Sequence, residues 1–92
     1  MAGGWLIGVM VAPRGERMQR HYYAVGDSDR HKAEWTAVDC AIRIGDVATS
    51  PVEGAEPVEA LRQYTPAKMA VLGLKAGEVR ELGWKHPRRW LG

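Results

Sequence analysis

The side chains of this chain that could bind a metal or attack a substrate are its histidines and its one cysteine. His21, His31 and His86 stand far apart in the sequence, and none has the spacing of a zinc ligand to another histidine or to Cys40. Cys40 falls in the middle of an expected helix, away from the helix N-terminus that would stabilise a thiolate. We therefore expect no catalytic residue, no metal and no cofactor.

The acidic turn Asp27-Ser28-Asp29 resembles the opening of a calcium-binding loop. An EF-hand loop that starts at Asp27 requires glycine at position 32 and glutamate at position 38, where this chain has Lys32 and Val38. Helix capping explains the same acidic residues, because Asp and Ser side chains accept hydrogen bonds from the first N–H groups of a helix. The turn therefore predicts the start of a helix.

Residues 84–92 alternate cations with aromatic rings and contain no acidic side chain. Their candidate partner-binding residues are Trp84, Arg88, Arg89 and Trp90. Cationic side chains neutralise phosphates and Trp stacks on unpaired bases, which is the combination found in single-strand nucleic-acid binders. Trp and Arg also anchor protein interfaces. We rank docking on a second copy or on another protein first, nucleic acid second, and contact with a membrane surface third, because three charges attract lipids only weakly.

A second candidate surface lies on an expected strand that contains Arg20, Tyr22 and Tyr23. Strand alternation places Arg20 and Tyr22 on one face and Tyr23 on the other. A nucleic-acid role for the 84–92 segment predicts an affinity that falls with salt and is lost when Arg88 and Arg89 become Ala. A protein-interface role predicts instead that Trp90→Ala matters more than either charge change.

Composition limits the class of protein. The 92 residues are 46% hydrophobic and 26% charged with a net charge of +2, which is ordinary for one small globular domain. A single cysteine excludes an internal disulfide and fits a reducing cytoplasm. The apolar run of residues 5–12 is too short for a signal peptide or a membrane span. We expect a cytoplasmic protein that does not insert into membranes.

Periodicity and turn residues indicate the elements. Residues 5–11 are apolar on both faces and predict an interior strand, and residues 18–25 pair with them in an antiparallel hairpin. A helix is expected over residues 30–44, with a core-facing stripe, and Gly45 is its expected stop. Residues 46–57 are expected to form a long loop, and residues 58–64 an edge strand after Pro57. The stripe consists of Trp35, Val38 and Ile42, together with Ala37, Ala41 and Ile44.

A second helix, over residues 66–72, has the clearest boundaries. Thr65 can cap its first turn, and Pro66 suits the first helical position because its missing N–H costs nothing there. Gly73 can take the left-handed conformation that ends a helix, and Leu74 can then fold back onto Met69. A brief extended segment is expected over residues 79–82.

These elements indicate an α+β fold, a small two-layer sandwich in the order β-β-α-β-α. The sheet is expected to have three strands, antiparallel or mixed, with the helices on one face. Residues 1–83 form the expected single domain, and residues 84–92 its basic, Trp-containing tail. Open sheet edges beside aromatic side chains favour a homodimer.

The function expected from the sequence is that of a non-catalytic binding or protein-interaction module that self-associates. A weak nucleic-acid binder that uses the basic aromatic tail is the alternative. A small enzyme or ligand-binding domain is a third possibility, and it would require a pocket that gathers titratable groups such as His21 or Asp27.

Overall fold

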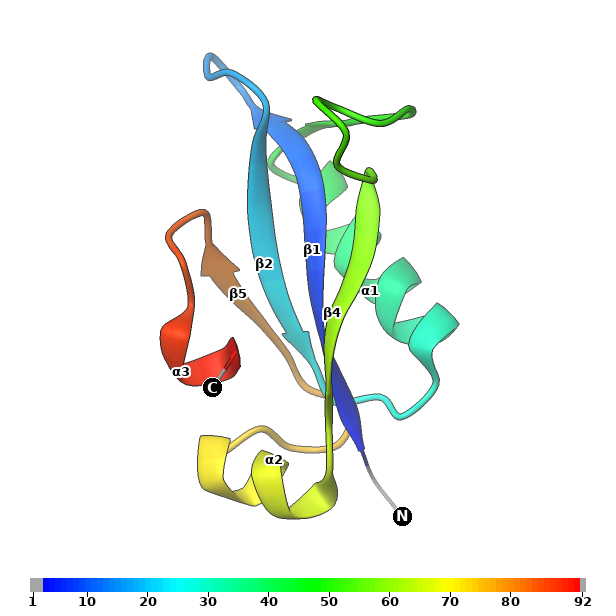
Figure 1. The fold of residues 1–92 in the computed structure, drawn as a ribbon, viewed down its shortest axis with the longest axis vertical. Coiled ribbons are helices and arrows are strands. Elements are labelled where there is room, and N and C mark those ends of the chain that lie inside the picture. The colour runs from blue at the N-terminus through cyan, green and yellow to red at the C-terminus, as the bar shows by residue number, and fades with distance from the viewer. Residues whose placement is uncertain (1–2, 92) are drawn as a thin grey trace.

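The computed structural model describes residues 3–91, and Met1, Ala2 and Gly92 lie outside the described residues. It is an α+β fold whose antiparallel sheet has five strands. Its elements in chain order are β1 (Gly4–Pro13), β2 (Gln19–Val25), α1 (Arg30–Ile42), β3 (Gly45–Val47), β4 (Val58–Tyr64), α2 (Pro66–Leu72), β5 (Val79–Gly83) and α3 (Arg88–Leu91). Figure 1 shows the strands side by side, with α1 behind the sheet and α3 in front of it.

Strand β1 is the centre of the sheet. It pairs with β2 along one side, and on its other side with β4 near its start and β3 near its end. Strand β5 extends the sheet beyond β2. The expected three-stranded sheet is therefore too small, because β3 lies at the start of the segment expected to be a loop and the brief segment after α2 also pairs.

Gly45 begins β3 and does not serve as the stop of α1, which ends at Ile42. A Cβ atom at Gly45 would collide with the Ala12 carbonyl oxygen. Only glycine allows the two backbones to approach so closely. The close approach of the two backbones explains why the three residues of β3 pair with β1 as a strand directly after the helix.

The core has two parts, one on each face of the sheet. The α1 core joins α1 to one face of β1 and β2, and the opposite core lies beneath α2 and α3. The expectation that all helices lie on one face is therefore wrong, since α1 covers one face of the sheet while α2 and α3 cover the other. The physical reason is that β1 is apolar on both faces, so each face requires its own cover. The α1 core contains Ile7, Val9, Val11, Tyr23, Val25, Ala33, Ala37, Cys40 and Ala41. The opposite core contains Leu6, Ala24, Tyr64, Met69, Leu72, Leu74 and Trp90.

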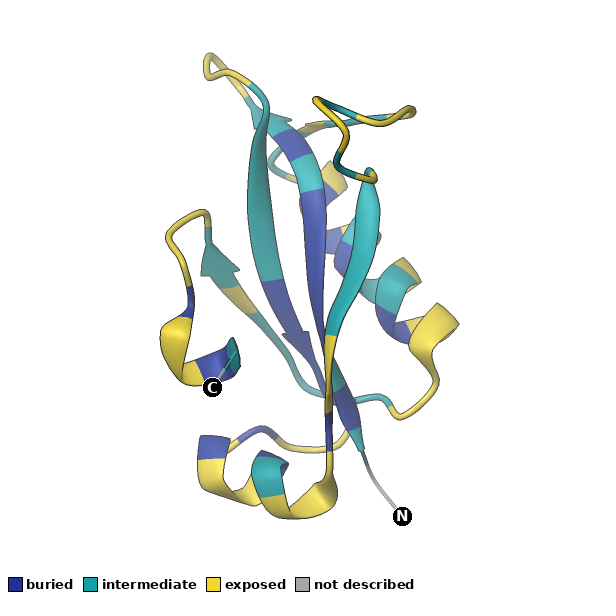
Figure 2. Ribbon diagram, viewed as in Figure 1, coloured by how far each residue is buried: buried dark blue, intermediate teal, exposed yellow. Residues whose placement is uncertain are grey.

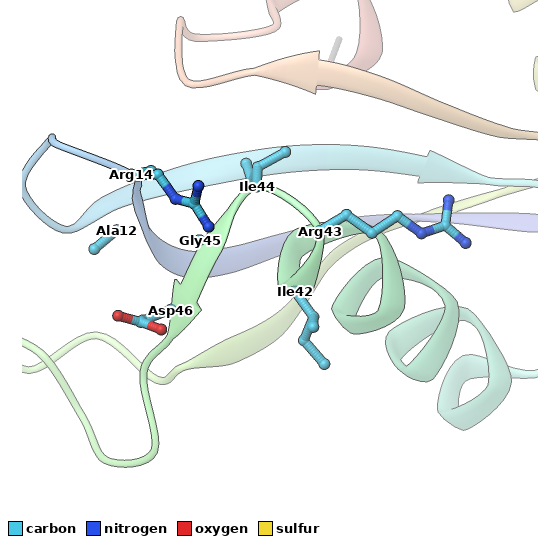
Figure 3. Close-up of a pocket in the computed structure, with 7 residues that line it drawn as sticks. All are labelled: Ala12, Arg14, Ile42, Arg43, Ile44, Gly45 and Asp46. Carbon is cyan, nitrogen blue, oxygen red and sulfur yellow. The ribbon is translucent and has the colours of Figure 1, made fainter.

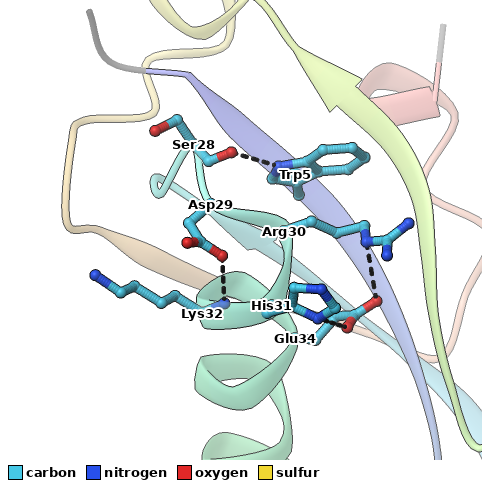
Figure 4. Close-up of polar contacts among 7 residues, drawn as sticks. All are labelled: Trp5, Ser28, Asp29, Arg30, His31, Lys32 and Glu34. Atoms are coloured by element: carbon cyan, nitrogen blue, oxygen red, sulfur yellow. Dashed lines mark hydrogen bonds and ion pairs between the residues drawn. The ribbon is translucent and has the colours of Figure 1, made fainter.

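Helix α1 starts where its cap predicts. The Asp29 carboxylate accepts a hydrogen bond from the Lys32 N–H at 3.1 Å. The preceding turn is fixed by the Trp5 indole N–H, which donates to the Ser28 carbonyl at 3.0 Å (Figure 4). These contacts join the start of α1 to the first strand.

The second helix matches its prediction. Thr65 Oγ1 accepts from the Lys68 N–H at 3.1 Å, Pro66 is the first helical residue, and Gly73 is left-handed with a φ of 72°. The Leu74 N–H returns to the Met69 carbonyl at 2.9 Å, which closes the expected stop. Among residues 3–91, no helix is long and apolar enough to cross a membrane.

Candidate interaction surface

An apolar stripe lies on the outer side of α1. Trp35 is 67% exposed and Ile42 is 59% exposed, while Val38 between them is half-buried. The sequence predicted that these residues face the core together with Ala37 and Ala41. That prediction is wrong for Trp35 and Ile42, whereas Ala37 and Ala41 are buried. The residues that face the sheet are the small ones, Ala33, Ala37, Cys40 and Ala41.

Small side chains decide which side of α1 is buried. They let the helix axis approach a sheet face that already holds Tyr23 and three β-branched side chains from β1, Ile7, Val9 and Val11. The large apolar residues Trp35 and Ile42 are then left exposed. Figure 2 shows that α1 has both buried and exposed residues along its length. The spacing of three and four residues along the stripe still keeps its apolar residues on one line of the helix.

The stripe borders the edge of the sheet. Glu34, Trp35 and Val38 line a shallow, apolar hollow of about 220 Å³ together with Val58 of β4. Within the described part of the chain, β4 pairs only with β1, so its outer side is open. The apolar stripe and an open strand edge therefore lie next to each other.

Charged side chains flank the stripe. Lys32 and Glu34 extend from opposite sides of α1 (Figure 4), and Glu34 lies 4.0 Å from Arg30 and 3.7 Å from His31. Asp39 and Lys32 are exposed, and neither forms an ion pair within residues 3–91. Asp39 and Arg43 stand four residues apart at the end of α1, and they do not form an ion pair in the described part of the chain.

The tail and the hairpin meet on the face opposite α1. Tyr22 contacts His86 edge-to-face, with ring centroids 6.5 Å apart. Arg20, on the same face of β2, forms an ion pair with Glu59 at 3.0 Å. Its alkyl chain crosses Gly8, where a Cβ atom would lie 3.0 Å from Arg20 Cδ. The guanidinium group is thus already engaged by a carboxylate from β4.

Tyr23 is placed apart from Arg20 and Tyr22, as strand alternation requires. It is buried in the α1 core. Burial, with smaller effects from Glu81 and Cys40, raises the pKa of Tyr23 to about 12. Its hydroxyl is therefore neutral over the physiological range.

The two tryptophans of the tail have different environments. Trp90 is 8% exposed and lies in the opposite core, where the Tyr64 hydroxyl donates to its carbonyl at 2.6 Å. The guanidinium carbons of Arg80 and Arg89 lie 5.7 and 5.8 Å from the Trp90 ring centroid. Trp84 is 56% exposed, and Lys85 Nζ lies 5.9 Å from its ring centroid. Trp84 and the exposed Arg88 are thus available at the surface, whereas Trp90 packs inside.

A polar hollow of about 600 Å³ lies where β1, the end of α1 and β3 meet (Figure 3). Its charged side chains are Arg14, Arg43 and Asp46. Figure 3 shows Arg43 extending away from Arg14, so the two guanidinium groups do not converge on one point. Neither Cys40 nor any of the three histidines lines this hollow.

The histidines and the cysteine are dispersed. Within residues 3–91, no group of three or more His, Cys, Asp or Glu side chains is placed to hold a metal ion. Burial lowers the pKa of His21, against a smaller opposing effect of Glu16, and its Nε2 atom is buried without a hydrogen-bond partner. Burial also raises the pKa of the Cys40 thiol. Both groups are held in their neutral forms near pH 7.

Comparisons with protein-family models, with curated proteins and with solved structures find no match for this chain. We therefore infer its function from the surfaces alone. The α1 stripe is the surface that the sequence pattern did not place correctly. Alanines at positions 33, 37 and 41 were the signal for it, because a line of small residues at a spacing of four marks a helix that packs closely.

Proposed function

We propose that this protein is a non-catalytic interaction module that self-associates through the α1 stripe. The observation that supports this function is the exposure of Trp35 and Ile42 on the same line of one helix. Scattered apolar residues are normal on a surface, but aligned large ones mark contact sites. A Trp ring also adds a large apolar area to an interface at a low cost in conformational entropy.

A second copy of the chain is a suitable partner because it presents the same stripe. Most soluble oligomers are symmetric dimers in which one patch meets itself. One helix face is small beside the roughly 800 Å² per partner of a standard interface, so we expect a dissociation constant on the order of micromolar.

The test is the solution mass across a range of protein concentrations, by sedimentation. The wild-type chain should move from monomer to dimer as concentration rises, and Trp35→Ala should remain monomeric over the same range. Trp84→Ala is the matched control, since it removes another large exposed ring from a different part of the surface. A wild-type chain that is monomeric at every concentration would refute this function.

Nucleic-acid binding by the tail is the second candidate, and the exposure of Trp84 beside Lys85 and Arg88 favours it. A stacking ring next to free cations suits single strands. Two neutralised phosphates would give a plot of log affinity against log salt with a slope of about −1.4. Binding of a single-stranded oligonucleotide that is insensitive to salt, or unchanged by Arg88→Ala with Lys85→Ala, would exclude this role.

A further inference from the structure

We propose that two copies pack their α1 helices stripe against stripe in an antiparallel arrangement, with Lys32 of each copy beside Asp39 of the other. This proposal rests on the proposed function, because it specifies the partner and geometry of the same stripe. The partner is a second copy of this chain.

The spacing on α1 makes one flank of the helix complementary to itself. Lys32 and Asp39 are seven residues apart, so they lie two turns apart on the same flank. Both are exposed, and neither has an ion-pair partner within the described part of its own chain. They are therefore opposite charges available to an external partner.

Symmetry then favours the antiparallel arrangement. When two identical helices run antiparallel about a two-fold axis perpendicular to both, each flank meets the same flank of its partner in the reverse direction. The start of the flank, which holds Lys32, meets the end, which holds Asp39. The two-fold axis generates this contact twice.

The apolar residues meet under the same alignment when the axis lies between Trp35 and Thr36, at the midpoint of Lys32 and Asp39. The two Trp35 rings then pack beside each other, and Ile42 reaches the start of the opposing helix. Burial of the rings supplies the affinity, while the charge pairs fix direction and register, because exposed ion pairs contribute little energy by themselves.

Glu34 lies on the other side of the stripe, toward β4, where it belongs to the hollow with Val58. Its neighbours there are Arg30 and His31 of its own helix. It is therefore already compensated within one chain and does not oppose the contact.

The experiment is a charge exchange measured by sedimentation equilibrium at low ionic strength. Lys32→Asp and Asp39→Lys, each alone, should raise the dissociation constant about tenfold, because each places like charges together at two symmetric contacts. The double variant restores opposite charges and should return to within about threefold of wild type. Arg62→Glu on β4 is the control and should leave the constant unchanged.

The outcomes separate this proposal from the function on which it rests. A wild-type chain that is monomeric at every concentration refutes both the self-association and the antiparallel contact. A wild-type dimer in which the double variant is no tighter than the single variants overturns the antiparallel α1 contact and leaves self-association in place. A dimer weakened by Arg62→Glu instead would assign the contact to the β4 edge. Far-ultraviolet circular dichroism of each variant establishes that α1 remains folded.

Discussion

Trp90 shows how burial changes the meaning of a side chain. In the sequence it stands beside two arginines and is indistinguishable in type from Trp84. In the structure the guanidinium groups of Arg80 and Arg89 both lie within 6 Å of its ring centroid, at 5.7 and 5.8 Å, and its carbonyl accepts a hydrogen bond from the Tyr64 hydroxyl. That hydrogen bond joins residues 26 positions apart, so no local pattern could reveal it.

Truncation of the two tail tryptophans should therefore have unequal effects. Trp90→Ala leaves a cavity in the opposite core and should lower the free energy of unfolding by about 3 kcal/mol. Trp84→Ala removes an exposed ring and should change it by less than about 0.5 kcal/mol. Urea denaturation of both variants measures the difference, and equal losses would contradict the assigned burial. Because Trp90→Ala alters folding, it is not by itself a test of partner binding.

At the scale of elements, the boundaries that local chemistry sets were predicted well. Strand β4 and helix α2 have the predicted bounds, Val58–Tyr64 and Pro66–Leu72. The cap at Thr65 and the left-handed Gly73 act within a few residues of chain, so the sequence contains all that is needed. The buried side of α1 and the formation of β3 depend on contacts with segments distant in the sequence. For these two features the prediction from the local pattern was wrong.

Strand β3 depends on one glycine. Gly45→Ala should lower the free energy of unfolding by about 3 kcal/mol, since the added methyl group meets the Ala12 carbonyl oxygen and one backbone must move. Gly15→Ala in the β1–β2 turn is the control. That position has a φ of 82° but open space around it, so the cost there should be about 1 kcal/mol of backbone strain. Thermal or urea unfolding of the two variants compares them, and an equal cost would argue against the close approach.

The cap of α1 gives a pH dependence of defined sign. Hydrogen bonding from the Lys32 N–H, above all, lowers the pKa of Asp29 from 3.8. A carboxylate with a depressed folded-state pKa stabilises the fold above its unfolded pKa, and that stability is lost as pH falls through the folded value.

Asp29→Asn keeps an accepting oxygen but cannot ionise. Wild type should therefore be more stable than this variant at pH 7, and the difference should shrink below about pH 4. Melting temperatures at pH 7, 4 and 2.5 measure it. A gap that stays constant across this range would show that the charge of Asp29 has no part in the cap.

At the scale of the whole molecule, the layers follow from one strand. The sequence shows that β1 is apolar on both faces, and each face is covered by its own helices. The order of the strands depends on pairing between distant segments, which a local sequence pattern does not reveal. The tail and the hairpin, predicted as separate surfaces, are neighbours because β5 places residues 84–91 beside β2.

Self-association should also appear in the unfolding of the whole molecule. A dimer that only the folded chain can form raises the melting temperature as protein concentration rises. We expect an increase across a hundredfold range of concentration for wild type and none for Trp35→Ala. Differential scanning calorimetry provides the measurement, and a wild-type melting temperature independent of concentration would contradict the dimer.

The central position of β1 has a consequence for synthesis. Gly4 pairs with Tyr64, so a strand made among the first residues waits for one made some sixty residues later. Helix α1 is made before β4 and can cover one face of β1, but the opposite face has no cover until α2 and α3 are made. Long-range strand pairing of this kind slows folding and prolongs the exposure of apolar surface to solvent. The nascent chain is therefore most vulnerable to aggregation, and most dependent on chaperones, before β4, α2 and α3 leave the ribosome.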